Sequence, residues 1–236
     1  MIPKIIHYCW FGGGEKSKLA KKCIASWNRF CTDYEIKEWN ETNFDVYSND
    51  YTKYCYENKK WAFLSDYIRL SVVYEYGGIY LDTDVEVLRT FDPLLDNHAF
   101  FGFETTDLIN TGHGFGAVRN NPLIRRMLDE YTSLVKNEDG SFTLNACPAI
   151  NTKPLLDDGL LQNGQEQTVS GALILPISFF NPYDDPTGRL NVTKDTFSIH
   201  WYNKSWISSK AKLRSRITRV FHRLFGVDCF SFLRKK

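Results

Sequence analysis

The stretch YEYGGIYLDTDVEV, residues 74–87, decides the fold that we expect. The glycines at 77 and 78 end an apolar segment, and residues 79–81 form a short aliphatic strand. Asp82 and Asp84 follow at the carboxyl end of that strand, where open α/β sheets bind their ligands. Residues i and i+2 of an extended segment point the same way, so we expect the two carboxylates to share one face.

A divalent cation is a natural partner for this Asp-x-Asp pair, because adjacent carboxylates repel each other. At an effective dielectric constant of 20, two unit charges about 4 Å apart interact by about 4 kcal/mol. Oxygen ligands suit hard ions such as Mg²⁺ or Mn²⁺, which also bind phosphate. Alternatively, the pair lies in a solvated turn, or Asp82 is the nucleophile of a haloacid-dehalogenase-type phosphatase. That phosphatase loop follows the first strand, whereas about 80 residues precede Asp82, so its position favours the metal site.

The segment before the glycines, residues 60–76, is apolar nearly all round and predicts a buried helix. Within it, Asp66 and Arg69 stand at i and i+3 and therefore lie on one face. Burial of a charge costs several kcal/mol unless the charge is paired. The two residues therefore form an internal ion pair, or they reach into a cleft and bind the hydroxyls of a sugar.

Strands and helices alternate along the first 135 residues, which predicts an α/β fold with a mostly parallel sheet and helices on both faces. The expected helices are 17–30, 60–76 and 122–135. The expected strands are 2–8, 34–39, 79–81, 85–88, 99–103, 114–118, 173–176 and 196–200. With 43% hydrophobic and 24% charged residues, the composition excludes a disordered or fibrous chain.

Charge is uneven along the chain, although the net charge is only +1. Residues 204–236 hold ten Lys and Arg against one acidic residue, Asp228. Apolar residues recur at helical spacing over 208–225, with basic residues on the other face. This pattern predicts a helix that lies on an anionic membrane or packs on the acidic body of the protein. The basic run contains no nucleic-acid motif, so we expect no nucleic acid as a partner.

Two further features bear on the compartment. No signal peptide and no apolar stretch of bilayer length is visible, and the six cysteines lack metal-site spacing. Free thiols are typical of a reducing compartment. We therefore expect a cytoplasmic protein.

Four segments, in this order, carry a resemblance to a known family: IPKIIHYCWFGG, WAFLSDYIRL, YEYGGIYLDTDVEV and SIHWYNKSW. They resemble the DXD-containing glycosyltransferases of bacterial capsule and surface-polysaccharide synthesis. That family is related to yeast initiating mannosyltransferases and, distantly, to the large clostridial glucosylating toxins. The resemblance implies a GT-A fold of the nucleotide-diphospho-sugar transferase type over residues 1–207, followed by a basic amphipathic tail, 208–236.

The resemblance also implies a reaction. A sugar would move from a UDP- or GDP-sugar donor to a glycan or lipid-linked glycan acceptor, with retention of anomeric configuration and with Mn²⁺ or Mg²⁺ as cofactor. The enzyme would be peripheral at the inner face of the plasma membrane, held there through the tail. A non-catalytic module that binds a sugar nucleotide stays open as an alternative.

Residue roles follow from the same resemblance. Asp82 and Asp84 would be catalytic and would bind the metal together with His200. Trp10 would stack on the donor base, Asp66 and Arg69 would bind the donor sugar, and Ser205 and Trp206 would cover the phosphates. The expected donor-binding residues are Trp10, Asp66, Arg69, Tyr80, Asn110, Ser205 and Trp206.

Overall fold

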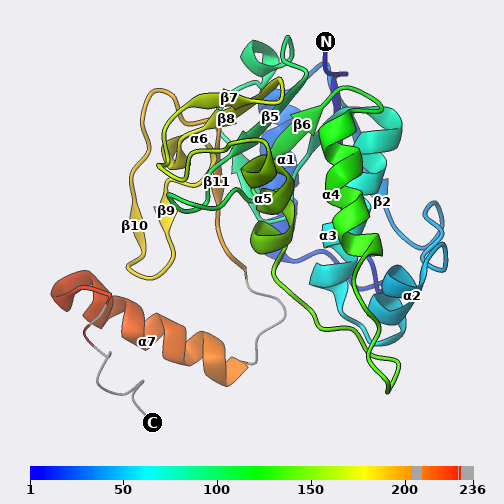
Figure 1. Cartoon of the computed structure of the whole chain (residues 1–236). Helices are drawn as coiled ribbons and strands as arrows, with labels where there is room; N and C mark the ends of the chain where they lie inside the picture. Colours follow the sequence, from blue (N-terminus) through cyan, green and yellow to red (C-terminus); the bar gives the residue numbers. More distant parts are fainter. Residues whose placement is uncertain (204–208, 228, 230–236) are drawn as a thin grey trace.

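A computed structural model describes residues 1–203, 209–227 and 229 (Figure 1). Its centre is a seven-stranded sheet with the strand order β2-β1-β3-β6-β5-β8-β7. These strands are β1 (Ile5–Cys9), β2 (Glu35–Trp39), β3 (Gly78–Tyr80), β5 (Ala99–Gly102), β6 (Phe115–Ala117), β7 (Gln167–Val169) and β8 (Ala172–Leu175). The helices are α1 (Lys18–Phe30), α2 (Asp50–Glu57), α3 (Trp61–Tyr76), α4 (Pro122–Thr132), α5 (Cys147–Asp157), α6 (Ile177–Phe180) and α7 (Ser209–Phe225), with a 3₁₀ turn η1 (Asp92–Leu94).

Most strands of this sheet run in one direction. β1 pairs in parallel with both β2 and β3, and β5 pairs in parallel with β8. β6 is antiparallel to its neighbours β3 and β5, and β7 is antiparallel to β8. The carboxyl ends of β1, β3, β5 and β8 therefore meet at one edge of the sheet. The expected mostly parallel sheet is confirmed.

Helices cover both faces of the sheet (Figure 1). On one face α3 packs on β1 and β3, α4 packs on α3, and α5 packs on α4. On the other face α1 packs on β4 (Val85–Val87), a short strand paired with β11 (Ser198–His200). Two separate clusters of buried side chains fill these faces, one around Ile68 and Phe101 and the other around Trp27 and Phe91.

The glycine pair explains how the chain passes directly from α3 into β3. Gly77 has φ 67 and Gly78 has φ 106, a conformation that disfavours other residues. A Cβ atom at Gly77 would also lie 2.9 Å from the backbone nitrogen of Arg119, and one at Gly78 would lie 2.7 Å from the carbonyl oxygen of Ile5. The predicted helix end at residue 76 is confirmed, and it places Asp82 at the sheet edge.

The C-terminal helix α7 lies on a hairpin made by β9 (Tyr183–Asp184) and β10 (Arg189–Leu190) (Figure 1). Nη2 of Arg219 on α7 is 2.9 Å from Oδ1 of Asp185 in the hairpin. Ile217, Val220, Phe221 and Leu224 of the same helix are exposed. Within the described residues, no helix has the length and apolar character that a membrane span requires.

Candidate active site

The Asp-x-Asp segment forms a tight turn between β3 and β4. The backbone nitrogen of Val85 donates to the carbonyl oxygen of Asp82 at 3.0 Å, and the nitrogen of Asp82 donates to the carbonyl of Gly112 at 3.0 Å. The expectation of an extended segment was therefore wrong, because β3 ends at Tyr80 and the chain reverses before β4. The two carboxylates come together through this turn rather than through strand alternation.

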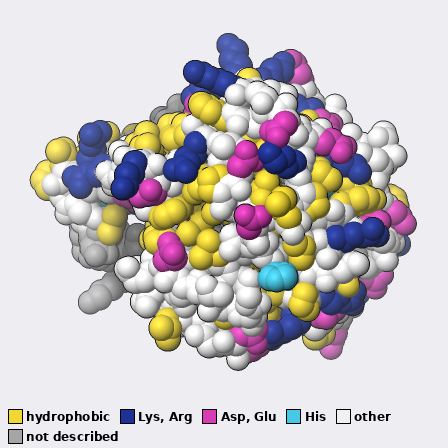
Figure 2. Space-filling model, turned by 90° about the horizontal axis from the view of Figure 1, so that it is seen from above, with side chains coloured by type: hydrophobic (Ala, Val, Ile, Leu, Met, Phe, Trp, Pro, Cys, Tyr) yellow, Lys and Arg dark blue, Asp and Glu magenta, His cyan; other side chains and the backbone are white. Residues whose placement is uncertain are grey.

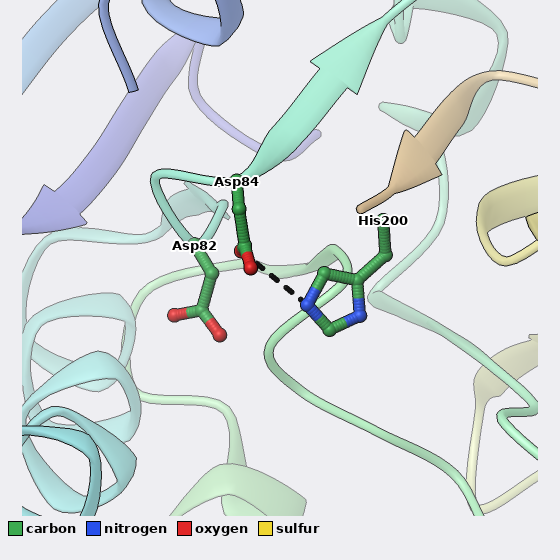
Figure 3. Close-up of side chains that lie close together, drawn as sticks. All are labelled: Asp82, Asp84 and His200. Carbon is green, nitrogen blue, oxygen red and sulfur yellow. Dashed lines mark ion pairs between the residues drawn. The ribbon is translucent and has the colours of Figure 1, made fainter. Parts of the chain in front are cut away.

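His200 joins the two aspartates from a distant part of the sequence. β11 pairs antiparallel with β4, with His200 opposite Val85. Its Nε2 atom is 3.3 Å from Oδ1 of Asp84 (Figure 3). One ligand atom from each of Asp82, Asp84 and His200 lies within 4.8 Å of the others. The structure thus brings together the three residues expected to hold a metal.

Asp66 and Arg69 extend this cluster from α3. Nη2 of Arg69 is 3.0 Å from Oδ1 of Asp66 and 3.0 Å from Oδ1 of Asp82. The hydroxyl of Tyr80 donates to Oδ1 of Asp82 at 3.1 Å. The internal ion pair is therefore real, and both of its members also line the cleft described below. Their role toward a donor sugar stays a prediction.

The charges in this cluster are unbalanced, because one guanidinium serves two carboxylates, the buried Asp66 and the partly buried Asp82. Burial raises the pKa of Asp66 to about 6, although Arg69 opposes the shift. Burial also raises the pKa of Asp82, again against the pull of Arg69. Burial acts the same way on Asp84, but His200 and the backbone nitrogen of Asn203, 2.7 Å from Oδ2, lower its pKa overall. The cluster is therefore short of positive charge.

A divalent cation fits this arrangement. Two carboxylates and one imidazole are donors that Mn²⁺ accepts readily, and Mg²⁺ prefers the carboxylates. Burial lowers the pKa of His200, but the charge of Asp84 outweighs it, so the pKa is raised overall. The negative charge around His200 therefore favours a cation at this position.

A cleft of about 1080 Å³ opens over this edge of the sheet. This volume is at the upper end of the range for ligand pockets, about 300–1000 Å³. All of the predicted donor-binding residues that the structure describes line the cleft, namely Trp10, Asp66, Arg69, Tyr80 and Asn110. Ser205 and Trp206 lie outside the described residues.

Trp10 stands just past the end of β1. It lines one end of the cleft, which we call the aromatic end and define by Trp10, Trp61 and Phe63. Its indole Nε1 donates to the carbonyl of Gly14 at 2.6 Å, and Nζ of Lys16 lies 5.6 Å from its ring centroid. Trp61 and Phe63, from the start of α3, line the same cleft. Such flat rings suit a nucleoside base.

The sequence analysis missed several residues of the cleft. Glu104, Cys147, Asn181 and Tyr202 also line it. Glu104 stands two residues after the end of β5, so its position after a parallel strand was an available signal. Tyr202 lies two residues after His200, and the rings of the two residues are 4.1 Å apart. No comparable sequence signal indicates that Asn181 or Cys147 belongs to the cleft.

Comparison with solved structures bears on the fold. The structure titled PaToxG glycosyltransferase matches with a TM-score of 0.51 and 18% sequence identity, over 67% of this chain and 70% of that chain. A likeness at this level of identity concerns the fold alone. The fold is GT-A-like, as expected.

Sequence comparisons give similarities to glycosyltransferases. Residues 17–101 match the family described as the glycosyltransferase sugar-binding region containing DXD motif. Inositol phosphoceramide mannosyltransferase 3 of Schizosaccharomyces pombe is 36% identical over 101 residues, 40% of this chain and 27% of that protein. The chain thus spans about a quarter of the length of that relative. An uncharacterized glycosyltransferase of Acanthamoeba polyphaga mimivirus is 28% identical over 222 residues, 87% of this chain and 84% of that protein.

These comparisons support the enzyme class expected from the sequence, a glycosyltransferase with a DXD sugar-binding region. The matched segment contains Asp66, Arg69, Asp82 and Asp84 and ends before Glu104.

Proposed function

We propose that this protein transfers a sugar from a UDP- or GDP-sugar to a glycan acceptor, with Mn²⁺ or Mg²⁺ bound by Asp82, Asp84 and His200. The observation that carries the proposal is the cluster of three ligand atoms within 4.8 Å of one another, in a cleft short of positive charge. A bare diphosphate would be repelled there, whereas a cation would attract it.

The bound cation would neutralise the charge that develops on the departing nucleoside diphosphate. The residues of the chain then have separate tasks. Arg69 holds the Asp82 carboxylate, and the Asn203 nitrogen and His200 hold that of Asp84. Trp10 would stack on the base, and Asp66 and Asn110 would bind hydroxyls of the donor sugar.

We further propose transfer with retention of configuration, with Ser205 and Trp206 covering the phosphates. Both proposals rest on the resemblance of the motifs. No side chain is assigned as a covalent nucleophile, since Arg69 already occupies both oxygens of Asp82. Proton NMR of the anomeric centre in the first product tests the stereochemistry.

A screen of UDP- and GDP-sugars for metal-dependent hydrolysis tests the activity. We expect turnover of at least one donor with Mn²⁺ or Mg²⁺, its loss with EDTA, and a fall of about 10²- to 10³-fold in Asp84→Asn. Asp96→Asn neutralises an exposed carboxylate two residues after η1 and serves as the matched control. Full activity of Asp84→Asn, or turnover that EDTA leaves intact, would contradict the proposal. Donor binding without any turnover would instead favour the non-catalytic module.

A lipid-linked acceptor at the cytoplasmic face of the plasma membrane is the finer proposal, as in bacterial surface-polysaccharide synthesis. The fission yeast relative is named for a lipid acceptor. Exposed basic and apolar side chains also share α7, which forms the lobe at the left edge of Figure 2. Each Lys or Arg near an anionic surface contributes about 1 kcal/mol.

Vesicle sedimentation tests the membrane proposal. We expect the full chain to sediment with phosphatidylglycerol vesicles and not with phosphatidylcholine vesicles. The double variant Arg214→Glu/Arg223→Glu, which changes exposed residues of α7, should reduce the bound fraction by at least about tenfold. Lys18→Glu/Lys53→Glu makes the same change in charge on α1 and α2 and should have little effect. Equal losses in the two variants would mean that net charge, and not α7, determines binding.

A further inference from the structure

The residues at one end of the cleft have no proposed role in binding the donor. We call this end the Glu104 end and define it by Glu104, Asn181 and Tyr202, all of which line the cleft. Glu104 follows β5, Asn181 follows α6 after β8, and Tyr202 follows β11.

The sheet order places this end relative to the aromatic end. Trp10 follows β1, Asp82 follows β3 and Glu104 follows β5, and the strands are ordered β1-β3-β6-β5-β8. Neighbouring strands lie about 4.8 Å apart, so β5 is roughly 10 Å from β3, on the side away from β1. The metal cluster therefore lies between the aromatic end and the Glu104 end.

The carboxylate of Glu104 is held in place through one of its oxygens. Oε1 accepts hydrogen bonds from Nδ2 of Asn110 at 3.1 Å and from the hydroxyl of Tyr202 at 3.1 Å. That hydroxyl in turn accepts from Nδ2 of Asn181 at 2.7 Å. Oε2 has no hydrogen-bond donor among the described residues, so a fixed carboxylate presents a free acceptor to the cleft.

A second acceptor at this end is also without a partner. Oδ1 of Asn181 is buried and has no hydrogen bond within the described part of the chain. The orientation of this amide is set, because its Nδ2 lies 3.5 Å from the carbonyl oxygen of Glu104, which can only accept. Buried polar atoms rarely stay unpaired in a native protein. The described residues therefore leave two acceptors at the Glu104 end without a hydrogen-bond donor.

Backbone strain supports the same conclusion. Tyr202 has φ 48, a left-handed conformation that a bulky residue adopts only when its surroundings impose it. In this conformation its hydroxyl reaches Glu104, and its ring lies beside that of His200 at a tilt of 34°. Strain of this kind clusters at ligand sites.

The charge around the Glu104 end restricts the ligand. Among the described residues that line the cleft, Arg69 is the one Lys or Arg, and two aspartates already hold it. Asp184 and Asp185 of the β9–β10 hairpin add carboxylates to the lining. A phosphate, sulfate or uronate would be repelled by the carboxylates of Glu104 and Asp184 there. A molecule rich in hydroxyl donors and without negative charge meets the requirement.

We propose that the Glu104 end is the acceptor subsite and that it binds a neutral sugar, whose hydroxyls donate to Oε2 of Glu104 and Oδ1 of Asn181. This assignment rests on the proposed function, since it makes the second substrate a glycan. Tyr183, which also lines the cleft, adds an aromatic face for the C–H side of a sugar ring.

Saturation-transfer NMR with simple glycosides tests the subsite. The probes are methyl β-glucoside, methyl β-galactoside and methyl α-mannoside, with methyl β-glucuronide as the charged counterpart, in the presence of UDP and Mg²⁺. We expect at least one neutral glycoside to bind and the glucuronide to bind at least about tenfold more weakly. Equal or tighter binding of the glucuronide, or binding of none of the neutral probes, would overturn the proposal.

Two variants locate the binding. Glu104→Gln replaces the free oxygen with an amide donor and should weaken the neutral glycoside by about 10- to 100-fold, the value of a hydrogen bond to a charged group. Asn181→Ala removes the second acceptor and should weaken it less. Asp96→Asn is the control. Losses of UDP affinity equal to those of glycoside affinity would assign Glu104 to the donor site and overturn the proposal. If wild-type protein binds glycoside but neither UDP nor GDP, the donor assignment fails while the sugar subsite stands.

Discussion

The two ends of the cleft are built in different ways. At the aromatic end and the metal cluster, most functional residues come in short motifs, with Asp66 and Arg69 on one helix and Asp82 and Asp84 in one turn. His200 is the exception, because it reaches Asp84 from a distant strand. At the Glu104 end, Asn181 reaches Glu104 across 77 residues of sequence. The family match covers residues 17–101 and therefore stops before the second end begins.

The two ends also differ in how their polar groups are satisfied. Arg69 is bonded to the carboxylates of Asp66 and Asp82, and Tyr80 adds a further bond. At the Glu104 end, two acceptors are oriented and left open. The cluster around Arg69 is therefore held together by its own ion pairs, whereas the Glu104 end has unpaired acceptors that the proposed acceptor sugar would fill. Four predictions test this difference between the two ends of the cleft.

The largest effect is expected on the paired side. Arg69→Met leaves two buried carboxylates without a counter-ion and should lower the free energy of unfolding by about 3–5 kcal/mol. Arg125→Met is the control, because Arg125 pairs with Asp129 at the surface and such a pair contributes about 1 kcal/mol or less. Urea unfolding measures both. Similar losses in the two variants would show that the Arg69 network does not hold the donor side together.

The second prediction concerns ligand affinity, which should distinguish the two ends of the cleft. Trp10→Ala removes the proposed stacking surface and should raise the Kd of UDP or GDP by about 5- to 100-fold, since base stacking contributes about 1–3 kcal/mol. Isothermal titration gives this value. The affinity for the neutral glycoside should change by less than about twofold, because Trp10 lies on the far side of the metal cluster. Equal effects on both ligands would remove the distinction between the ends.

His7 is buried in β1, the strand that Trp10 follows, and the pH dependence of stability tests its hydrogen bonding. His7 bonds the Gly77 carbonyl at 2.8 Å and the Trp39 indole at 3.1 Å, and burial lowers its pKa to about 4, although the Gly77 bond opposes the shift. The unfolded chain takes up this proton near pH 6.5, so stability is present above that pH and is lost as pH falls toward 4.

Between pH 7 and pH 5 this single group should cost about 2 kcal/mol of unfolding free energy. Burial lowers the pKa of His113 as well, which adds to the loss in the same direction. Urea unfolding of wild type and His7→Gln at both pH values isolates the contribution of His7. Identical pH dependence in the two proteins would rule out a neutral, fully bonded His7.

The smallest effect is expected at the Glu104 end. Tyr202→Phe keeps the ring beside His200 and removes one donor to Glu104, so the neutral glycoside should bind about three- to tenfold more weakly, the value of one hydrogen bond. Competition NMR against the wild type measures this change. An unaltered affinity would show that the Tyr202 hydroxyl does not orient the carboxylate.

Much of the donor side could be predicted from the sequence because its signals are local. The apolar run and the glycine pair mark α3 and its end, and Ser17 caps α1 by accepting from the backbone nitrogen of Ala20, as its sequence position indicates. His200 was reached only through the resemblance of motifs. The turn at Asp82 was mistaken for extended chain, because two acids after a strand do not reveal where the strand ends.

The Glu104 end and the neighbouring helix α5 lack such local sequence signals. α5 was not predicted, since the prolines at 148 and 154 are typical of a loop, although Pro148 is compatible with the first turn of a helix. Glu104 and Asn181 have no periodic or motif partner nearby in the sequence. Their meeting depends on the pairing of β5 with β8, which no local pattern determines.

The central claim is that the Asp82–Asp84–His200 cluster holds a divalent cation. Electron paramagnetic resonance of Mn²⁺, titrated with the full chain in the absence of nucleotide, measures this binding directly. We expect one bound Mn²⁺ per chain, with at least about tenfold weaker binding in Asp84→Asn and unchanged binding in Asp96→Asn. Equal Mn²⁺ affinity of wild type and Asp84→Asn would contradict it.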